Sequence, residues 1–179
     1  MISLIPVETS QDILQEYRGT PIGLLLEYHN LHRPLDAYTN AQLLIGMCID
    51  HRKLLRLPQN FAYVIRSGGA NLRYSEFMVS FAIAVGGVQA VALIGHTQCG
   101  MMNLSTRRQL FIHGLIERAG WTEEQAAEHF LQSAPKFEIG NVEEFIVSEA
   151  SRFRQMYPKV IVAPLLYRVE DNRLYQLEG

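Results

Sequence analysis

The sequence has two cysteines, and each stands in a short cluster of residues that can do chemistry. Cys48 opens the cluster Cys-Ile-Asp-His-Arg, and Cys99 closes the cluster His-Thr-Gln-Cys that begins at His96. Thiolate sulfur and imidazole nitrogen are preferred zinc ligands, usually in tetrahedral geometry. His96 and Cys99 can bind one ion together if the two residues between them form a turn. Cys48 must come from a distant part of the chain, so such a site depends on the tertiary fold.

A centre with three protein ligands leaves a fourth position for water, which is typical of a catalytic zinc site. Zinc lowers the pKa of such a water to about 7, so that hydroxide is available at neutral pH. Two thiolates make zinc a weaker Lewis acid than three imidazoles would, so neighbouring residues must assist. The alternatives for these cysteines and this histidine are a structural zinc site or unrelated buried thiols.

Asp50 and Arg52 are the candidates for this assistance. Alternation along an extended segment would point Cys48, Asp50 and Arg52 to the same side. Paired with Arg52, Asp50 would be held off the metal and would accept a hydrogen bond from bound water or hydroxide. Without that pairing, Asp50 could be the fourth ligand and close the site. An ordinary salt bridge is the alternative for the pair. We expect the open arrangement at neutral to alkaline pH.

Each cluster follows a short apolar run, at residues 43–47 and 90–95, of the kind that forms buried parallel strands. In open α/β sheets, ligands bind beyond the carboxyl ends of the strands. Residues 61–65 predict another strand, and Arg66-Ser-Gly-Gly-Ala-Asn follows it. Its two glycines indicate either a plain turn or a close approach of the backbone to a ligand.

Later residues predict a buried strand at 160–163 and a terminal hairpin or edge extension made by 165–169 and 174–177. Helices are expected between and before the strands. One is expected from Ser10 to Arg18.

Further helix starts are indicated at Thr20-Pro21, at Thr122 and at Asn141. A helix at 75–85 would carry an apolar stripe that we interpret as core. The stripe consists of Phe77, Met78, Phe81, Ala82 and Val85.

The remaining histidines are interpreted without chemistry. His29 and His32, near the end of the helix that Thr20 begins, are expected to be helix-end cations or surface residues. His113 and His129 are expected to be surface or packing residues.

Composition narrows the class of protein. The chain has 179 residues, 48% of them hydrophobic and 19% charged, which fits one domain with a substantial core. The net charge of −2 and the absence of basic stretches with aromatic residues argue against nucleic acid. No segment approaches the roughly 20 apolar residues that cross a bilayer, and the first residues do not resemble an export signal. With two cysteines beside polar residues, we expect a reduced, cytoplasmic protein.

The motifs C-x-D-x-R at 48–52 and H-x-x-C-G at 96–100 together resemble the signature of the β-class carbonic anhydrases. Residues 66–71 are similar to that family's R-N-x-G/A-N stretch. The likeness covers about residues 43–100. It implies zinc ligands at Cys48, His96 and Cys99, and a catalytic pair of Asp50 and Arg52, with Asp50 as a fourth ligand in a closed state.

The resemblance also implies a mainly parallel α/β sheet flanked by helices, formed by a single domain of residues 1–179. A helical arm at residues 1–40 is expected to pack on a partner subunit. The implied activity is the reversible hydration of carbon dioxide to bicarbonate by zinc-bound hydroxide, in a homodimer or a dimer of dimers whose active sites lie near the subunit interface. No nucleic acid or membrane partner is expected.

Three positions depart from the family pattern. His51 stands where the family usually has serine, Ser67 replaces an asparagine, and no glutamine has a suitable position ahead of the first strand. A chain with this site could therefore act on a carbon dioxide analogue such as carbon disulfide or carbonyl sulfide. It could also be a non-catalytic, zinc-stabilised interaction protein.

Overall fold

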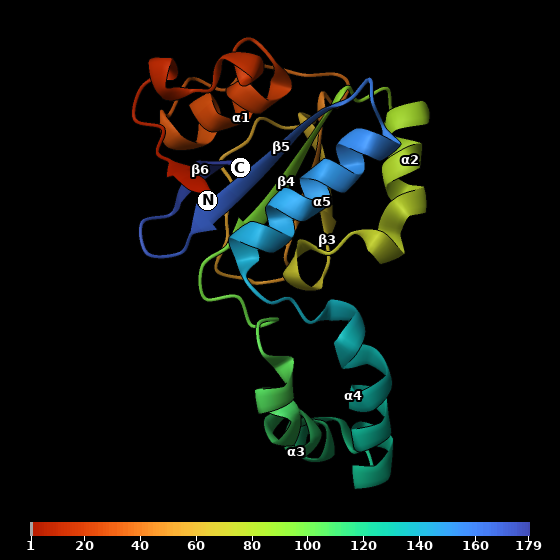
Figure 1. The fold of residues 1–179 in the computed structure, drawn as a ribbon. Helices are drawn as coiled ribbons and strands as arrows, with labels where there is room; N and C mark the ends of the chain where they lie inside the picture. The colour runs from red at the N-terminus through yellow and green to blue at the C-terminus, as the bar shows by residue number, and fades with distance from the viewer. Residues whose placement is uncertain (1) are drawn as a thin grey trace.

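The structure, a computed structural model, describes residues 2–179, which build one mixed sheet covered by helices on both faces (Figure 1). Six strands of these residues form the sheet, in the order β1-β6-β5-β4-β2-β3. The strands are β1 (Ser3–Ile5), β2 (Leu43–Met47), β3 (Ala62–Arg66), β4 (Ala90–His96), β5 (Ile161–Arg168) and β6 (Arg173–Glu178). The helices are α1 (Pro21–Asn30), α2 (Glu76–Ala84), α3 (Arg108–Ala119), α4 (Glu123–Phe137) and α5 (Val142–Met156).

Strands β3, β2, β4 and β5 run parallel, so the prediction of a mainly parallel sheet is confirmed. All residues of β2 and β4 are buried, as expected for strands that are covered on both faces. After β2 the chain forms β3 on one side and then returns to form β4 on the other side. The carboxyl ends of β2 and β4 therefore lie at a topological switch point, where α/β sheets bind their ligands.

The other end of the sheet is antiparallel. Strands β5 and β6 form the expected terminal hairpin, and β1 pairs with the outer side of β6. Strand β5 is continuous, so the two short strands predicted at 160–163 and 165–169 are one. Six consecutive residues within it are buried, so the strand continues through the boundary that the prediction placed between the two segments.

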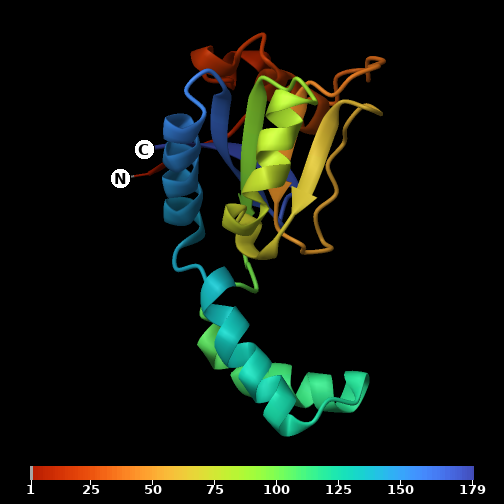
Figure 2. The ribbon, with the colours of Figure 1, turned by 90° about the vertical axis from the view of Figure 1, so that its right-hand side faces the viewer.

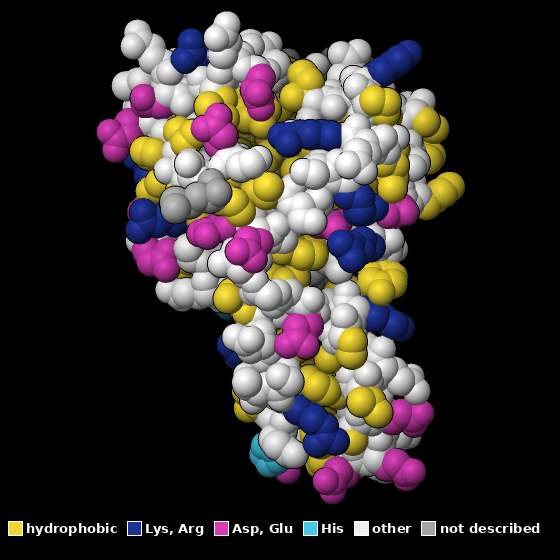
Figure 3. All heavy atoms as spheres, in the orientation of Figure 1, with side chains coloured by type: hydrophobic (Ala, Val, Ile, Leu, Met, Phe, Trp, Pro, Cys, Tyr) yellow, Lys and Arg dark blue, Asp and Glu magenta, His cyan; other side chains and the backbone are white. Residues whose placement is uncertain are grey.

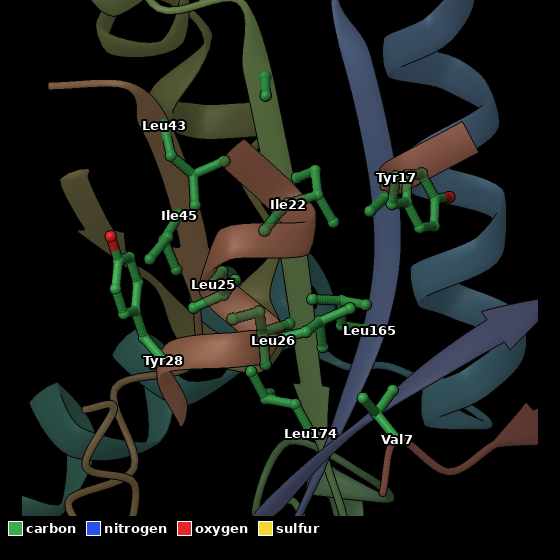
Figure 4. Close-up of a cluster of buried hydrophobic side chains, with 14 of the residues drawn as sticks. Val7, Tyr17, Ile22, Leu25, Leu26, Tyr28, Leu43, Ile45, Leu165 and Leu174 are labelled. Atoms are coloured by element: carbon green, nitrogen blue, oxygen red, sulfur yellow. The ribbon is translucent and has the colours of Figure 1, made fainter. Parts of the chain in front are cut away.

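Helix α1 packs on one face of the sheet, with Ile22, Leu25 and Leu26 fully buried (Figure 4). Thr20 caps it as expected, because its hydroxyl accepts hydrogen bonds from two backbone N–H groups of the first turn. The first forty residues thus pack on the sheet of their own chain, through both α1 and β1. That they also contact a partner subunit stays a prediction.

The prediction of a helix from Ser10 to Arg18 is wrong. Two short 3₁₀ turns, Ser10–Asp12 and Gln15–Tyr17, stand there instead. The Asp12 carboxylate accepts hydrogen bonds from the backbone N–H groups of Glu8 and Thr9, at 3.0 and 2.7 Å, which stabilises a local turn in place of a continuous helix.

Helices α2 and α5 lie on the opposite face. Three residues of α5, Ile146, Ala150 and Phe153, are fully buried against the sheet. Helix α2 lies beside the edge strand β3 and buries Val79 and Ala82 (Figures 1 and 2).

The prediction that the whole apolar stripe of α2 is core is wrong for most of its residues. Ala82 is buried, but Phe77 is 81% exposed. Three further stripe residues, Met78, Phe81 and Val85, are exposed as well. Figure 3 shows hydrophobic side chains gathered at this side of the molecule. Within residues 2–179 no element lies outside the edge of the sheet to cover them.

Helices α3 and α4 form a hairpin that projects away from the sheet (Figures 1 and 2). Gly120 ends α3 in a left-handed conformation, and Thr122 begins α4 with the predicted capping box. The rings of Phe111 and Phe130 pack edge to face at 5.2 Å between the two helices. None of the helices in residues 2–179 has the length and apolarity needed to cross a membrane.

Candidate metal centre

The structure brings together the three residues that the sequence predicted as metal ligands. Cys48 directly follows β2, His96 is the last residue of β4, and Cys99 lies in the turn after it. Their ligand atoms all lie within 4.8 Å of one another, and all three residues are buried. The two sulfur atoms are 4.0 Å apart. This Cys-His-Cys group is compatible with zinc, because it offers the atom types and close spacing that zinc requires.

The orientation of the His96 ring fits a metal ligand. Its Nδ1 lies 2.8 Å from the backbone oxygen of Thr97. A carbonyl oxygen only accepts hydrogen bonds, so Nδ1 carries the proton and Nε2 keeps a free lone pair. Nε2 is buried and has no hydrogen-bond partner among residues 2–179. A buried nitrogen without a partner is costly, and a metal ion would satisfy it.

A hydrogen bond between the sulfur atoms of Cys48 and Cys99 shifts the pKa values of the two thiols in opposite directions. A hydrogen bond with Cys99 lowers the pKa of Cys48 to about 3, with further help from His96 and the Asp50 backbone, although burial raises it. The same hydrogen bond, together with burial, raises the pKa of Cys99. A lowered pKa favours the thiolate form of Cys48, which is the form that binds metals.

Asp50 and Arg52 form a close ion pair beside the three ligand atoms. Arg52 donates to both carboxylate oxygens, with Nε 3.0 Å from Oδ1 and Nη2 2.7 Å from Oδ2. These hydrogen bonds lower the pKa of Asp50, which is therefore a carboxylate at neutral pH. Its Oδ2 lies 4.0 Å from Nε2 of His96.

The path of the backbone at this pair differs from the prediction. Residues 48–52 are not an extended segment, because β2 ends at Met47 and a turn follows. The Arg52 N–H donates to Asp50 Oδ1 at 2.9 Å, so the carboxylate itself closes the turn. Alternation was therefore the wrong reason for expecting Asp50 and Arg52 on the same side.

Two further basic residues at the centre were missed. Arg66, at the end of β3, donates to the backbone oxygens of Cys48 and Asp50 at 3.1 and 3.2 Å, and so ties the ligand loop to the sheet. Lys53 is 2% exposed, and its Nζ has no hydrogen-bond partner among residues 2–179. Burial lowers the pKa of Lys53, while the charges of Cys48 and Asp50 raise it. Arg66 could have been found from the sequence, because it directly follows a predicted strand and the carboxyl ends of parallel strands lie at the same edge of the sheet. Nothing in the sequence indicates that Lys53 is buried.

A third missed residue, Gln98, lies between two of the ligands. Its side-chain oxygen accepts a hydrogen bond from Arg52 Nη1 at 3.0 Å, and its backbone oxygen accepts one from Nη2 at 3.1 Å. Its position inside the H-x-x-C motif was a usable signal, because a residue between two ligands must lie at the site.

The glycines at 66–71 serve close packing within the chain. Gly69 has a left-handed backbone with φ of 64°. A Cβ atom at Gly68 would lie 3.0 Å from the sulfur of Met101, and one at Gly69 would lie 3.1 Å from Ile139. The structure thus shows a turn at these glycines, packed closely against side chains of the chain itself. Gly68 also lines an apolar cavity, so a close approach to a ligand stays a prediction.

Three of the remaining histidines, His32, His113 and His129, are exposed, as predicted. His29 is different, because it is buried and hydrogen-bonded. Its Nδ1 accepts from the Arg56 N–H at 3.1 Å, and its Nε2 lies 2.9 Å from the Asn172 backbone oxygen. Burial lowers the pKa of His29, so the interpretation as a helix-end cation or surface residue is wrong.

The fold is that of solved β-class carbonic anhydrases. Carbonic anhydrase isoform I from Trichomonas vaginalis aligns with a TM-score of 0.61 and 18% identity, over 80% of this chain and 87% of that one. The carbonic anhydrase from Glaciozyma antarctica aligns with a TM-score of 0.60 and 21% identity, over 76% of this chain and 83% of that one.

A carbon disulfide hydrolase in its apo form is a third similar structure, with a TM-score of 0.54, 18% identity and coverage of 75% of this chain and 77% of that one. Neither a protein-family description nor a curated protein matches the chain by sequence. At such low identities the likeness establishes the β-carbonic-anhydrase fold, which confirms the architecture that the motifs implied.

Proposed function

We propose that the chain is a zinc-dependent carbonic anhydrase that catalyses the reversible hydration of carbon dioxide to bicarbonate. The observation that carries this proposal is the unpartnered, buried Nε2 of His96, which lies within 4.8 Å of the sulfur atoms of Cys48 and Cys99. The position of this group at the switch point of a β-carbonic-anhydrase fold supports it further.

The residues of the chain have separate tasks in this proposal. Cys48, His96 and Cys99 would hold zinc, which supplies Lewis acidity and lowers the pKa of a water ligand to about 7. Asp50 accepts a hydrogen bond from the attacking water at its carboxylate and orients the oxygen lone pair towards the substrate carbon. Arg52 engages both oxygens of Asp50, which keeps the carboxylate charged and away from the three ligand atoms.

An apolar cavity of about 340 Å³ supports an uncharged, apolar substrate. Its lining includes Ile49 and Met101, which are close in sequence to Cys48 and Cys99. It also includes aromatic residues of the α3–α4 hairpin: Phe111, Phe130 and Phe137. Carbon dioxide fits this chemistry. Carbon disulfide and carbonyl sulfide fit it as well, so hydrolysis of such an analogue is the second candidate activity.

The test is a stopped-flow assay of carbon dioxide hydration on protein whose zinc content has been measured. Parallel samples receive carbon disulfide, and released sulfide is measured. Zinc-loaded wild-type protein is expected to hydrate carbon dioxide, and metal-free protein is expected to be inactive. Sulfide release without hydration would favour the second activity. A zinc-loaded protein inactive in both assays would leave the non-catalytic, zinc-stabilised interaction protein as the function.

We further propose a homodimer or a dimer of dimers, with residues 1–40 contacting the partner subunit and the active sites near the interface. A cytoplasmic location is part of the same proposal, and this part rests on the small number of cysteines in the sequence.

A further inference from the structure

Glu170 lies outside both ligand motifs, yet it is connected to the metal centre. It stands in the turn between β5 and β6, and its Oε1 accepts a hydrogen bond from Gln98 Nε2 at 2.9 Å. Its Oε2 accepts one from the Thr97 hydroxyl at 2.7 Å. Thr97 in turn accepts from the Val169 N–H at 3.0 Å, so the turn and the H-x-x-C segment hold each other in place.

These contacts fix which end of the Gln98 amide faces Arg52. A guanidinium only donates hydrogen bonds, and a carboxylate only accepts them. The amide therefore must present its oxygen to Arg52 and its NH₂ group to Glu170, as the structure shows. A hydrogen bond from Thr97 lowers the pKa of Glu170, which is therefore in its accepting form at neutral pH.

The backbone of Gln98 adds a second constraint on the same guanidinium. Gln98 has a left-handed conformation with φ of 56°, which non-glycine residues adopt rarely and at a cost. In this conformation its backbone oxygen also accepts from Arg52 Nη2, at 3.1 Å. Gln98 thus holds Nη1, which Asp50 does not contact, and shares Nη2 with Asp50.

The hydrogen bonds form a single directed chain. Gln98 donates to Glu170, Arg52 donates to Gln98, and Arg52 also donates to both oxygens of Asp50. Loss of the Glu170 acceptor would leave the amide of Gln98 held by Arg52 alone. The side chain of Gln98 would then be less restricted, and its oxygen would hold Arg52 less firmly.

We propose that Glu170 is a positioning residue, which acts through Gln98 to hold Arg52 against Asp50 and so keeps Asp50 off the three ligand atoms. This inference rests on the proposed function, because it assigns a role to a residue that supports the Asp50–Arg52 pair. It adds a residue 72 positions away from Gln98 to the centre.

The experiment compares Glu170→Ala with Glu170→Gln. Alanine removes the acceptor, whereas the glutamine oxygen can still accept from Gln98. In zinc-loaded protein, Glu170→Ala is expected to lower kcat about fivefold, the factor equivalent to one hydrogen bond of ordinary net strength, with KM unchanged. Glu170→Gln is expected to restore most of kcat. Asp171→Asn is the matched control in the same turn. The carboxylate of Asp171 accepts hydrogen bonds from the Tyr175 hydroxyl and the Arg173 backbone N–H, and not from Gln98.

A second readout does not depend on activity. The side-chain N–H signals of Arg52 are recorded by NMR in metal-free and zinc-loaded protein. In wild type and Glu170→Gln they are expected to show the hindered rotation of a guanidinium held on two sides. In Glu170→Ala they are expected to broaden or to average.

The outcomes separate this inference from the proposed function. Wild-type hydration together with unchanged kcat and unchanged Arg52 signals in Glu170→Ala would overturn the positioning role. A lower melting temperature alone would show a purely structural role for Glu170 and would also overturn it. A third outcome combines changed Arg52 signals in Glu170→Ala with a wild-type protein that does not hydrate carbon dioxide. It would overturn the proposed function and retain the contact network.

Discussion

The metal centre and the outer face of α2 both depart from the usual distribution of polar and apolar groups. At the centre, polar groups are buried: His96 is 0% exposed and Lys53 is 2% exposed. On α2, apolar groups are exposed, with Phe77 at 81%. A buried donor or acceptor without a partner destabilises a protein, and so does a large exposed apolar patch. At the centre, Nε2 of His96 has no hydrogen-bond partner among residues 2–179. On α2, no element of these residues covers Phe77.

The largest expected effect is at the metal centre. Cys48→Ala or Cys99→Ala removes one of the three proposed ligands, and we expect the zinc content to fall from about one per chain to near zero after dialysis against a chelator. Elemental analysis measures it. His129→Ala, on the α3–α4 hairpin, is the control and should keep its zinc. Full zinc in both cysteine variants would contradict the assignment of the centre.

Arg52→Ala is expected to have the next largest effect. It frees the carboxylate of Asp50 to approach the three ligand atoms, because the guanidinium that engages both of its oxygens is gone. We expect the rate of carbon dioxide hydration to fall at least about 100-fold, which is typical when a positioned proton acceptor is lost. The metal content should stay near that of wild type.

Stopped-flow hydration across the pH range measures this effect. Arg33→Ala is the control, since Arg33 forms an ion pair with Glu27 away from the centre. Wild-type hydration by Arg52→Ala at every pH would mean that the Asp50–Arg52 pair is an ordinary salt bridge and that the proposed mechanism is wrong.

The exposed apolar residues of α2 indicate a surface that a partner protein covers. Strand β3 beside it is an edge strand of the sheet, so a second copy of the chain could cover both elements. We expect light scattering at micromolar concentration to show a dimer or a dimer of dimers. Phe77→Glu should weaken association at least about 30-fold, as for a central interface residue, without unfolding the single chain.

Leu131→Glu is the matched control for this test, because Leu131 is similarly exposed on α4. A dimeric Phe77→Glu protein would place the partner on another surface. A wild-type monomer with full activity would contradict the dimer itself.

The sequence sufficed for those parts of the molecule that depend on short segments. The buried strands β2 and β4 were visible as apolar runs, and the residues that end them had to meet at one edge of a parallel sheet. Cys48 and His96 could therefore be placed at the same edge of the sheet from the sequence alone, without knowledge of any contact. The capped helix starts at Thr20 and Thr122 were local in the same sense.

Features that depend on distant partners were not predictable. Periodicity identified the apolar face of α2 but could not show that no element of the chain covers Phe77. The pairing of Gln98 with Glu170 joins residues 72 apart, and neither stands in a pattern that selects the other. The burial of His29 has the same cause, since its partners are backbone groups of Arg56 and Asn172 from two other parts of the chain.

The smallest expected effect concerns His29, which is a buried polar group like those of the centre, but with both nitrogens satisfied. Because its pKa in the folded chain is lowered below 6.5, the unfolded chain binds a proton more readily. Its contribution to stability is therefore fully present above about pH 6.5 and is lost as the pH falls towards the folded pKa, with a slope of at most about 1.4 kcal/mol per pH unit.

His29→Gln removes this titration, so its free energy of unfolding should depend less on pH between about 7 and 5 than that of wild type. Urea unfolding at several pH values measures the difference between the two proteins, and the titration of the metal ligands cancels because both proteins share it. His32→Gln is the matched control, since His32 is exposed three residues further along the chain. It should keep the wild-type slope. Equal slopes for wild type and His29→Gln would mean that burial does not hold His29 neutral, and the analogy between it and the buried groups of the centre would fail.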